Sequence, residues 1–191
     1  MAKTESTLRN MVLSLTLIAL VAATALGFVY EVTKKPIEIS KLNKKLIAIK
    51  AVVPPFDNNP DNEMFRLAGD NGDSLEIYPA KSGGTIVGYA VRTYTVNGFS
   101  GYIGIMAGFS PDGTIINTNV LEHKETPGLG TKMTEDVFKT QFNGKDPSSF
   151  AMKVKKDGGQ VDAITAATIT SRAFCEAVDR AYKTLKKGGL I

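Results

Sequence analysis

The sequence predicts an α+β protein, in which a single N-terminal transmembrane helix is followed by one domain with an antiparallel sheet flanked by helices. Three observations support this fold class. Residues 11–30 form an apolar run without a charged side chain. Between Leu75 and Leu121, strand-like runs alternate with turn signals. After Phe174, apolar residues recur at intervals of three and four, which is the spacing of a helix with one buried face.

Size and composition limit the number of domains and argue against nucleic-acid binding and a metal site. The 191 residues suffice for one domain plus an appendage. The formal net charge of +4 is spread along the chain without a basic block that carries stacking aromatics, so we expect no nucleic-acid binding. With one histidine, His123, and one cysteine, Cys175, a typical zinc site cannot be assembled, and we expect no metal. Cys175 falls beside the apolar face of the last predicted helix, where we expect a packed thiol.

Residues 1–10 are expected to form a short tail, and residues 11–30 the transmembrane helix. About 20 residues, with a rise of about 1.5 Å each, cross a hydrocarbon core of about 30 Å. A cleavable signal peptide is the alternative, with Lys3 and Arg9 before the apolar centre and a small-residue segment at 23–25. The apolar run continues to Tyr30, beyond what a signal peptide needs, and therefore favours an anchor.

The orientation of the anchor is left open by the sequence. A bare count of positive charges puts the domain in the cytoplasm, because more lysines follow the span than precede it. The charge rule is weak here, however, since long domains translocate largely regardless of their charge. The lysines after the span are Lys34, Lys35, Lys41, Lys44 and Lys45.

Residues 31–55 are expected to form an amphipathic juxtamembrane helix. Pro36 is placed for a helix start, and Pro54-Pro55 would end the helix. Its apolar stripe either lies on the membrane or a partner subunit, or packs on the chain's own domain, and both readings stay open. The stripe consists of Ile39, Leu42, Leu46, Ile49 and Val53.

Residues 56–191 are expected to form the domain. Phe56 to Asp73 is rich in Asn, Asp, Pro and Gly and predicts a loop. Asn97-Gly98 and Pro111-Asp112-Gly113 are turn signals between strand-like runs, which together predict an antiparallel meander. The predicted strands are Leu75–Tyr78, Thr85–Tyr94, Tyr102–Gly108 and Thr114–Leu121.

Smaller elements are predicted beyond the meander. Thr134 can cap a short helix that stacks Phe138 over Phe142. Phe150, Met152 and Val154 alternate as a strand, which a turn at residues 157–159 directs toward Val161–Ile164.

The last predicted helix gives Thr168 a special position. Ser171 or Thr170 is a natural N-cap, so Thr168 lies at, or just ahead of, the helix N-terminus. Free backbone N–H groups and the positive end of the helix dipole suit an anion such as phosphate there. The competing reading is that these hydroxyl residues serve only as caps. The helix is expected to end at Lys186 and Lys187, before a Gly-Gly stop.

A second stretch with chemical content is residues 123–132, at the end of a predicted strand. A proline and two glycines favour a defined loop that a ligand can approach closely, and Glu125, Thr126 and Lys132 offer polar contacts. Taken alone, this stretch is either an ordinary loop or a binding loop.

Both stretches resemble one family. Residues 162–168, Asp-Ala-Ile-Thr-Ala-Ala-Thr, resemble the flavinylation motif Asp-x-x-Ser/Thr-Gly-Ala-Thr/Ser of the FMN-binding domain family, and residues 125–130 resemble its Glu-Thr-Pro-Gly-Leu-Gly segment. The resemblance implies FMN held covalently through a phosphoester to Thr168. It also implies a separate flavin transferase that installs the FMN from FAD and recognises Asp162, Thr165, Ala167 and Thr168. Ala166 stands where the family usually has Gly, and Ala tolerates a positive φ poorly.

The resemblance also implies which other residues contact the cofactor. Glu125 and Thr126 would hydrogen bond to the ring or the ribityl edge, and Leu129 would pack on the ring. Lys132 would face the phosphate or the reduced ring, and Arg172 would hold the phosphate or else remain solvent-exposed. The full set of expected cofactor-binding residues is Glu125, Thr126, Leu129, Gly130, Lys132, Thr165, Ala166, Ala167 and Arg172.

Nearly the whole chain shares the resemblance, which is strongest to components of Rnf-type ion-translocating oxidoreductase complexes. It implies a single-pass protein of the cytoplasmic (inner) membrane, with its domain on the periplasmic side and other membrane subunits as partners. The chain would relay electrons between ferredoxin and NAD, coupled to ion translocation, without independent turnover of a metabolite. The alternatives are a tethered flavoprotein of another respiratory or extracellular electron chain, a cofactor-free membrane adaptor, and a hydrolase or transferase built on Thr168.

Overall fold

The computed structural model describes residues 7–69 and 72–191. Most of the predicted tail, including Lys3, lies outside the described residues, as do two positions of the predicted loop at 56–73. The chain divides into two compact units, Met1–Asn43 and Lys44–Ile191.

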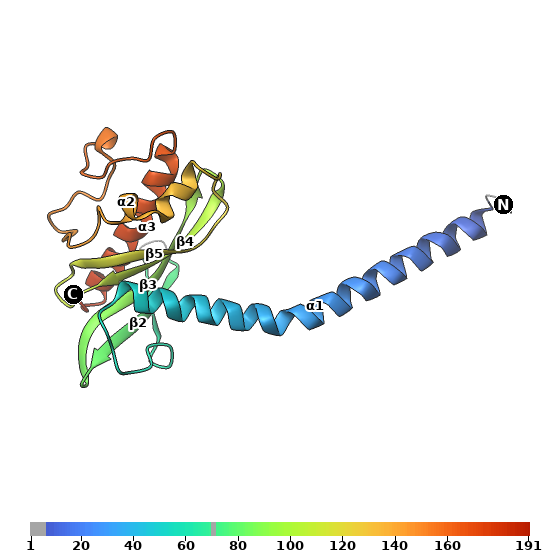
Figure 1. Cartoon of the computed structure of the whole chain (residues 1–191), viewed down its shortest axis with the longest axis horizontal. Coiled ribbons are helices and arrows are strands. Elements are labelled where there is room, and N and C mark those ends of the chain that lie inside the picture. The colour runs from blue at the N-terminus through green and yellow to red at the C-terminus, as the bar shows by residue number, and fades with distance from the viewer. Residues whose placement is uncertain (1–6, 70–71) are drawn as a thin grey trace. The chain divides into compact units, whose positions relative to one another are not determined.

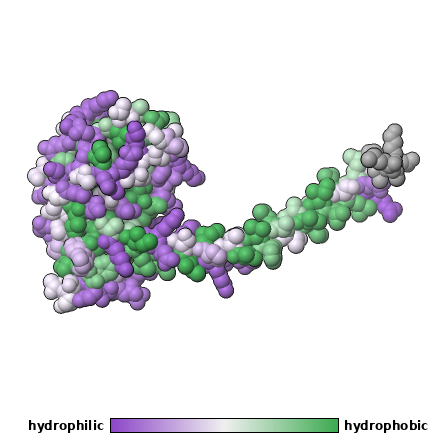
Figure 2. All heavy atoms as spheres, in the orientation of Figure 1, coloured by the Kyte–Doolittle hydropathy of each residue, from purple (hydrophilic) through white to green (hydrophobic). Residues whose placement is uncertain are grey.

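Helix α1, Leu8–Val52, runs without interruption through both of the helical segments that the sequence predicts. The predicted helix start at Pro36 is wrong, because Pro36 lies inside α1. A proline there removes one N–H donor from the helix interior and crowds the carbonyl group four residues earlier, and α1 continues past it. Among the described residues, α1 is the one helix long and apolar enough to cross a membrane, and no residue of its apolar stretch is buried. Figure 2 shows apolar side chains along this part of α1.

The second unit contains a five-stranded antiparallel sheet in the order β1-β2-β3-β4-β5, which confirms the predicted meander. All four predicted strands are present and extend beyond their predicted C-terminal ends, and the last begins at Ile115 instead of Thr114. The prediction missed β1, which lies in the stretch interpreted as a loop. The strands are β1 Phe65–Ala68, β2 Ser74–Ser82, β3 Thr85–Gly98, β4 Gly101–Phe109 and β5 Ile115–His123.

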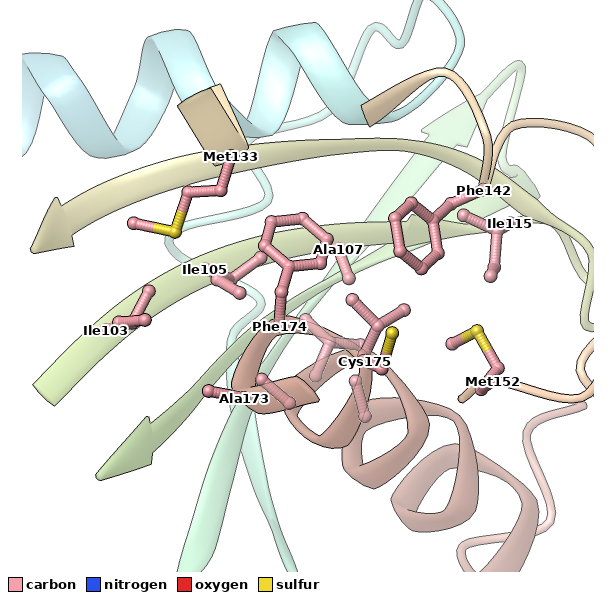
Figure 3. Close-up of a cluster of buried hydrophobic side chains, with 14 of the residues drawn as sticks. Ile103, Ile105, Ala107, Ile115, Met133, Phe142, Met152, Ala173, Phe174 and Cys175 are labelled. Carbon is pink, nitrogen blue, oxygen red and sulfur yellow. The ribbon is translucent and has the colours of Figure 1, made fainter. Parts of the chain in front are cut away.

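Helix α3, Thr168–Lys187, covers one face of the sheet (Figure 1). Its apolar residues occur with helical spacing, so one face of α3 is buried against the strands. Phe174 points from α3 toward the sheet, and its ring centroid lies 5.1 Å from that of Phe142 (Figure 3). Cys175 is buried in the same core, and burial raises the pKa of its thiol to about 12. The expectation of a packed thiol is confirmed.

The C-terminal end of α1, which belongs to the second unit, covers the opposite face of the sheet. Ile49 and Val52 are fully buried in a second core cluster. At Gly108 a Cβ would overlap the carbonyl oxygen of Val52, so the close approach of α1 to β4 requires a glycine. The end of the predicted apolar stripe therefore packs on the chain's own domain, whereas Ile39 and Leu42 remain exposed. The partners of α1 in this cluster include Tyr78, Ala80, Ala90 and Met106.

The segment between β5 and α3 contains only short elements. These are a 3-10 helix at Gly130–Thr134, helix α2 at Asp136–Lys139 and a 3-10 helix at Lys155–Asp157. The predicted contact between Phe138 and Phe142 is confirmed, with ring centroids 5.6 Å apart.

Two predictions in this segment are wrong. Thr134 does not cap α2, because its hydroxyl donates to the Thr131 carbonyl and α2 begins after Glu135. The predicted strand at residues 150–154 is reduced to an isolated bridge between Val154 and Val161. The Lys153 N–H donates to the Ala151 carbonyl, and this local turn prevents an extended ladder.

Candidate functional site

The N-terminus of α3 begins at Thr168, as the sequence predicts. No side chain caps this end of the helix, so the predicted cap by Thr170 or Ser171 is wrong: both lie inside the first turn. The buried Ser171 hydroxyl instead donates to the Ala167 carbonyl at 3.0 Å and accepts the Ile164 N–H at 2.9 Å. The Ser171 side chain thereby fastens the preceding loop to the helix. Among the residues that the structure describes, no side chain compensates the positive end of the helix dipole at Thr168.

Ala166 gives this loop its shape. Its φ is 61°, and it is the one non-glycine residue with a positive φ among residues 7–69 and 72–191. A left-handed conformation costs an L-residue about 1–2 kcal/mol, because Cβ approaches a carbonyl oxygen. The positive φ that alanine tolerates poorly is therefore present at Ala166, and the folded chain accommodates it.

Two stretches that are far apart in the sequence meet at one pocket of about 300 Å³. From the loop after β5 come Glu125, Thr126, Leu129 and Gly130, and from the start of α3 comes Thr168 with the two alanines before it. Seven of the predicted site residues thus share one pocket. The complete lining is Phe99, Glu125, Thr126, Leu129, Gly130, Ala166, Ala167, Thr168, Ile169 and Thr170.

Phe99, Ile169 and Thr170 line the pocket, yet they were missing from the predicted site. Phe99 lies at the tip of the β3–β4 hairpin and is 68% exposed. A large aromatic residue beside a Gly-containing turn is a signal in the sequence that could have identified it. Ile169 and Thr170 follow the motif directly, and their roles depend on the helix starting at Thr168 rather than later.

Three predicted residues lie outside this pocket, in a neighbouring groove of about 430 Å³ beside α2. They are Lys132, Asp162 and Thr165. The Asp162 carboxylate lies 2.7 Å from Lys155 Nζ, and its backbone N–H donates to Gln141 Oε1 at 2.7 Å. The Asp162 side chain is nevertheless 67% exposed. The carboxylate of Asp162, the first residue of the motif, therefore faces solvent and not the pocket.

Arg172 also lies outside the pocket lining. Its guanidinium donates two hydrogen bonds of 2.7 Å to the Asp157 carboxylate. These bonds hold the pKa of Asp157 below its usual value. Arg172 therefore fastens the segment at residues 155–157 to the first turn of α3, and half of its side chain is exposed. The phosphate contact that the resemblance implies stays a prediction.

The pocket residues fit an FMN molecule. Phe99, Leu129 and Ile169 are exposed apolar side chains that can contact a flat ring. The uncapped N-terminus of α3 suits a phosphate, and the half-buried Thr168 lies at that terminus. The pocket volume lies at the lower end of the range for ligand sites, about 300–1,000 Å³.

Comparison with known proteins agrees with this assignment. The FMN-binding domain family matches residues 98–183. The chain is 34% identical to the G subunit of the Na⁺-translocating ferredoxin:NAD⁺ oxidoreductase complex of Acetobacterium woodii, over 92% of this chain and 91% of that protein. It is 35% identical to the G subunit of the ion-translocating oxidoreductase complex of Aliivibrio fischeri, over 94% of this chain and 92% of the relative.

A similar fold occurs in a solved structure. The C subunit of the Na⁺-translocating NADH-quinone reductase of Parabacteroides distasonis superimposes with a TM-score of 0.50 over 66% of this chain and 78% of that chain. The sequence identity is 24%, so the similarity concerns the fold alone.

Proposed function

This chain belongs to the family formed by the G subunits of ion-translocating oxidoreductase complexes, and from that premise we propose that it is a membrane-anchored electron-transfer protein that carries FMN. The observation that supports this function best is the shared pocket of Thr168 and the loop at residues 125–130. FMN supplies the capacity to take up and release one or two electrons. The chain's own residues bind it, orient it and limit its contact with water.

The attachment is proposed to be covalent, through the Thr168 hydroxyl. The threonine oxygen forms an ester bond to the flavin-side phosphorus of FAD, the phosphoanhydride bond breaks, and AMP leaves as the hydroxyl proton is released. The half-buried position of Thr168 at an uncapped helix start supports this role, because the phosphoester would meet backbone N–H groups. A covalent cofactor cannot dissociate between turnovers.

A flavin transferase is the proposed partner during maturation. Asp162 and Thr165 support this proposal because both are exposed in the folded chain, on the groove beside the pocket. They are therefore accessible to an enzyme that works on Thr168.

The remaining partners are proposed to be membrane subunits of the same complex, which exchange electrons with the FMN during ion translocation. A single transmembrane anchor confines the carrier near these partners and raises their effective concentration.

The attachment site can be tested on a denaturing gel viewed under ultraviolet light. The native chain, made together with a flavin transferase, is expected to give a fluorescent band, because a covalent flavin survives denaturation. Thr168→Val should abolish the band, since valine has a similar shape but no hydroxyl. Thr168→Ser is the matched control and should retain it. A Thr168→Val band of full brightness would show that the flavin is attached elsewhere.

A further inference from the structure

Glu125 is the one charged residue that is buried among residues 7–69 and 72–191, with 5% of its surface exposed. Its carboxylate contacts no cation among those residues: the groups that hydrogen bond to it are a hydroxyl and a backbone amide. Two hydrogen bonds offset part of the desolvation cost of this buried carboxylate, but no opposite charge among the described residues does. Packing alone does not explain such a residue in the wall of a ligand pocket.

The carboxylate of Glu125 joins three separate segments. Oε2 accepts the Thr170 hydroxyl of α3 at 2.6 Å, and Oε1 accepts the Ser100 N–H of the β3–β4 hairpin at 2.9 Å. Gly130 makes room for this arrangement, because a Cβ there would overlap Glu125 Oε2 and lie 2.9 Å from Thr170 Oγ1. The hairpin, the loop and the helix are thus fixed to one another by a single side chain.

The three residues beside the Glu125 carboxylate are the hydrogen-bonded Ser100 and Thr170 and the closely packed Gly130, and each is the chain neighbour of one apolar pocket residue. Phe99 precedes Ser100, Leu129 precedes Gly130 and Ile169 precedes Thr170. Holding Glu125 in place therefore restrains the backbone at all three apolar walls, through hydrogen bonds beside Phe99 and Ile169 and through close packing beside Leu129.

We propose that Glu125, held in place by Thr170, positions the three apolar walls and that its negative charge lowers the reduction potential of the flavin. The proposal rests on the proposed function. When the ring takes up one electron from a donor protein without a proton, no bond is made or broken and the ring gains one negative charge. A fixed negative charge in the pocket wall opposes that gain, because screening by water is reduced in a partly enclosed site.

The redox part of the proposal is tested by measuring midpoint potentials of the flavin-loaded chain over a range of pH. Glu125→Gln keeps the side-chain shape and removes the charge. We expect a positive shift equal to about a tenfold change in the equilibrium constant for one-electron uptake, which is about 59 mV. An unchanged potential would overturn the charge-setting role.

The role of Thr170 in holding Glu125 is tested by the same measurement of midpoint potentials. Thr170→Val removes the hydrogen bond to Glu125 and should shift the potential, whereas Thr170→Ser should restore the native value. The double variant Glu125→Gln, Thr170→Val should shift the potential by less than the sum of the single changes, because both act through one contact. Additive shifts would overturn the coupling. Thr184→Val is the matched control, since Thr184 is a buried threonine of the same helix whose hydroxyl donates to the Arg180 carbonyl.

The positioning role has a test that needs no flavin. In the chain made without a transferase, the Ser100 amide is hydrogen-bonded to Glu125, so its exchange with solvent hydrogen should be slow. Glu125→Ala should accelerate exchange at Ser100, and Thr184→Val should not. Equal exchange rates in the native chain and in Glu125→Ala would overturn the positioning role. The gel assay keeps the two hypotheses apart, because a native chain without covalent flavin would contradict the proposed function and leave this exchange result unaffected.

Discussion

At the scale of single residues, Ala166 is a position where the chain is not optimised for stability. Its φ of 61° suits glycine, which has no Cβ. We expect Ala166→Gly to raise the free energy of unfolding by about 1 kcal/mol, because the relief of strain exceeds the added entropy of the unfolded chain. Urea unfolding of the second unit measures the change.

The matched control for this prediction is Ala163→Gly. Ala163 has a negative φ, so glycine there should lower the free energy of unfolding. A loss of stability in both variants would contradict the strain at Ala166.

Phe99 is more exposed than the two other apolar side chains of the pocket, Leu129 and Ile169, and its proposed contact is the flavin ring. We expect Phe99→Trp to reduce flavin fluorescence strongly in the folded chain and to leave it bright after denaturation, because an indole stacked on a flavin quenches it. Val96→Trp is the matched control, since Val96 is exposed on the same hairpin but does not line the pocket. Equal fluorescence of the two folded variants would place the ring elsewhere.

The local sequence predicted those site residues whose position depends only on neighbouring residues. Thr168 could be placed at a helix start, and the loop at residues 125–130 could be identified, because both depend on short motifs. The contacts of Glu125 with Thr170 and Ser100 could not be predicted, since they require the packing of hairpin, loop and helix. The ion pair of Arg172 with Asp157 could not be predicted either, because it depends on how the segment before α3 folds back onto the helix.

At the scale of secondary structure elements, the end of α1 is part of the folded domain. Ile49 and Val52 are fully buried on the sheet, and burying such a side chain contributes about 1.5–3 kcal/mol. We therefore expect a chain that begins at residue 56 to be less stable than one that begins at residue 44 by about 4 kcal/mol or more. Chemical denaturation of the two chains measures the difference.

A more conservative variant serves as the control for truncation. Ile49→Ala in the chain that begins at residue 44 should lower the unfolding free energy by about 2–5 kcal/mol, and Ile47→Ala should change it little, because Ile47 is 66% exposed. Equal stability of the two truncated chains would mean that α1 is dispensable for the sheet.

The secondary structure elements differ in how well the local sequence predicts them. The central strands were predictable because alternating residues and Gly-containing turns agree there with the sheet. The alternation at residues 150–154 was misleading, because a tight turn from Ala151 to Lys153 takes the hydrogen bond that a ladder would need. Strand β1 was missed because four residues are too short a pattern to stand out in a stretch rich in turn residues.

At the scale of the whole molecule, the orientation in the membrane is the next quantity to measure. We propose that the second unit lies on the outer side of the cytoplasmic membrane. Protease added to intact spheroplasts should then degrade residues 44–191, because no lipid barrier protects them. A cytoplasmic marker protein should survive in the same sample. Protection of the second unit until the membrane is permeabilised would place it in the cytoplasm.

The single cysteine has a practical consequence at this scale. Cys175 is buried and its thiol pKa is raised to about 12, so little of the reactive thiolate forms near neutral pH. A maleimide reagent should therefore react with a cysteine introduced on the surface and leave the native one untouched. Spin labels or crosslinkers can be attached at chosen positions without first replacing Cys175, and distances from the chain to neighbouring proteins become measurable in the assembled complex.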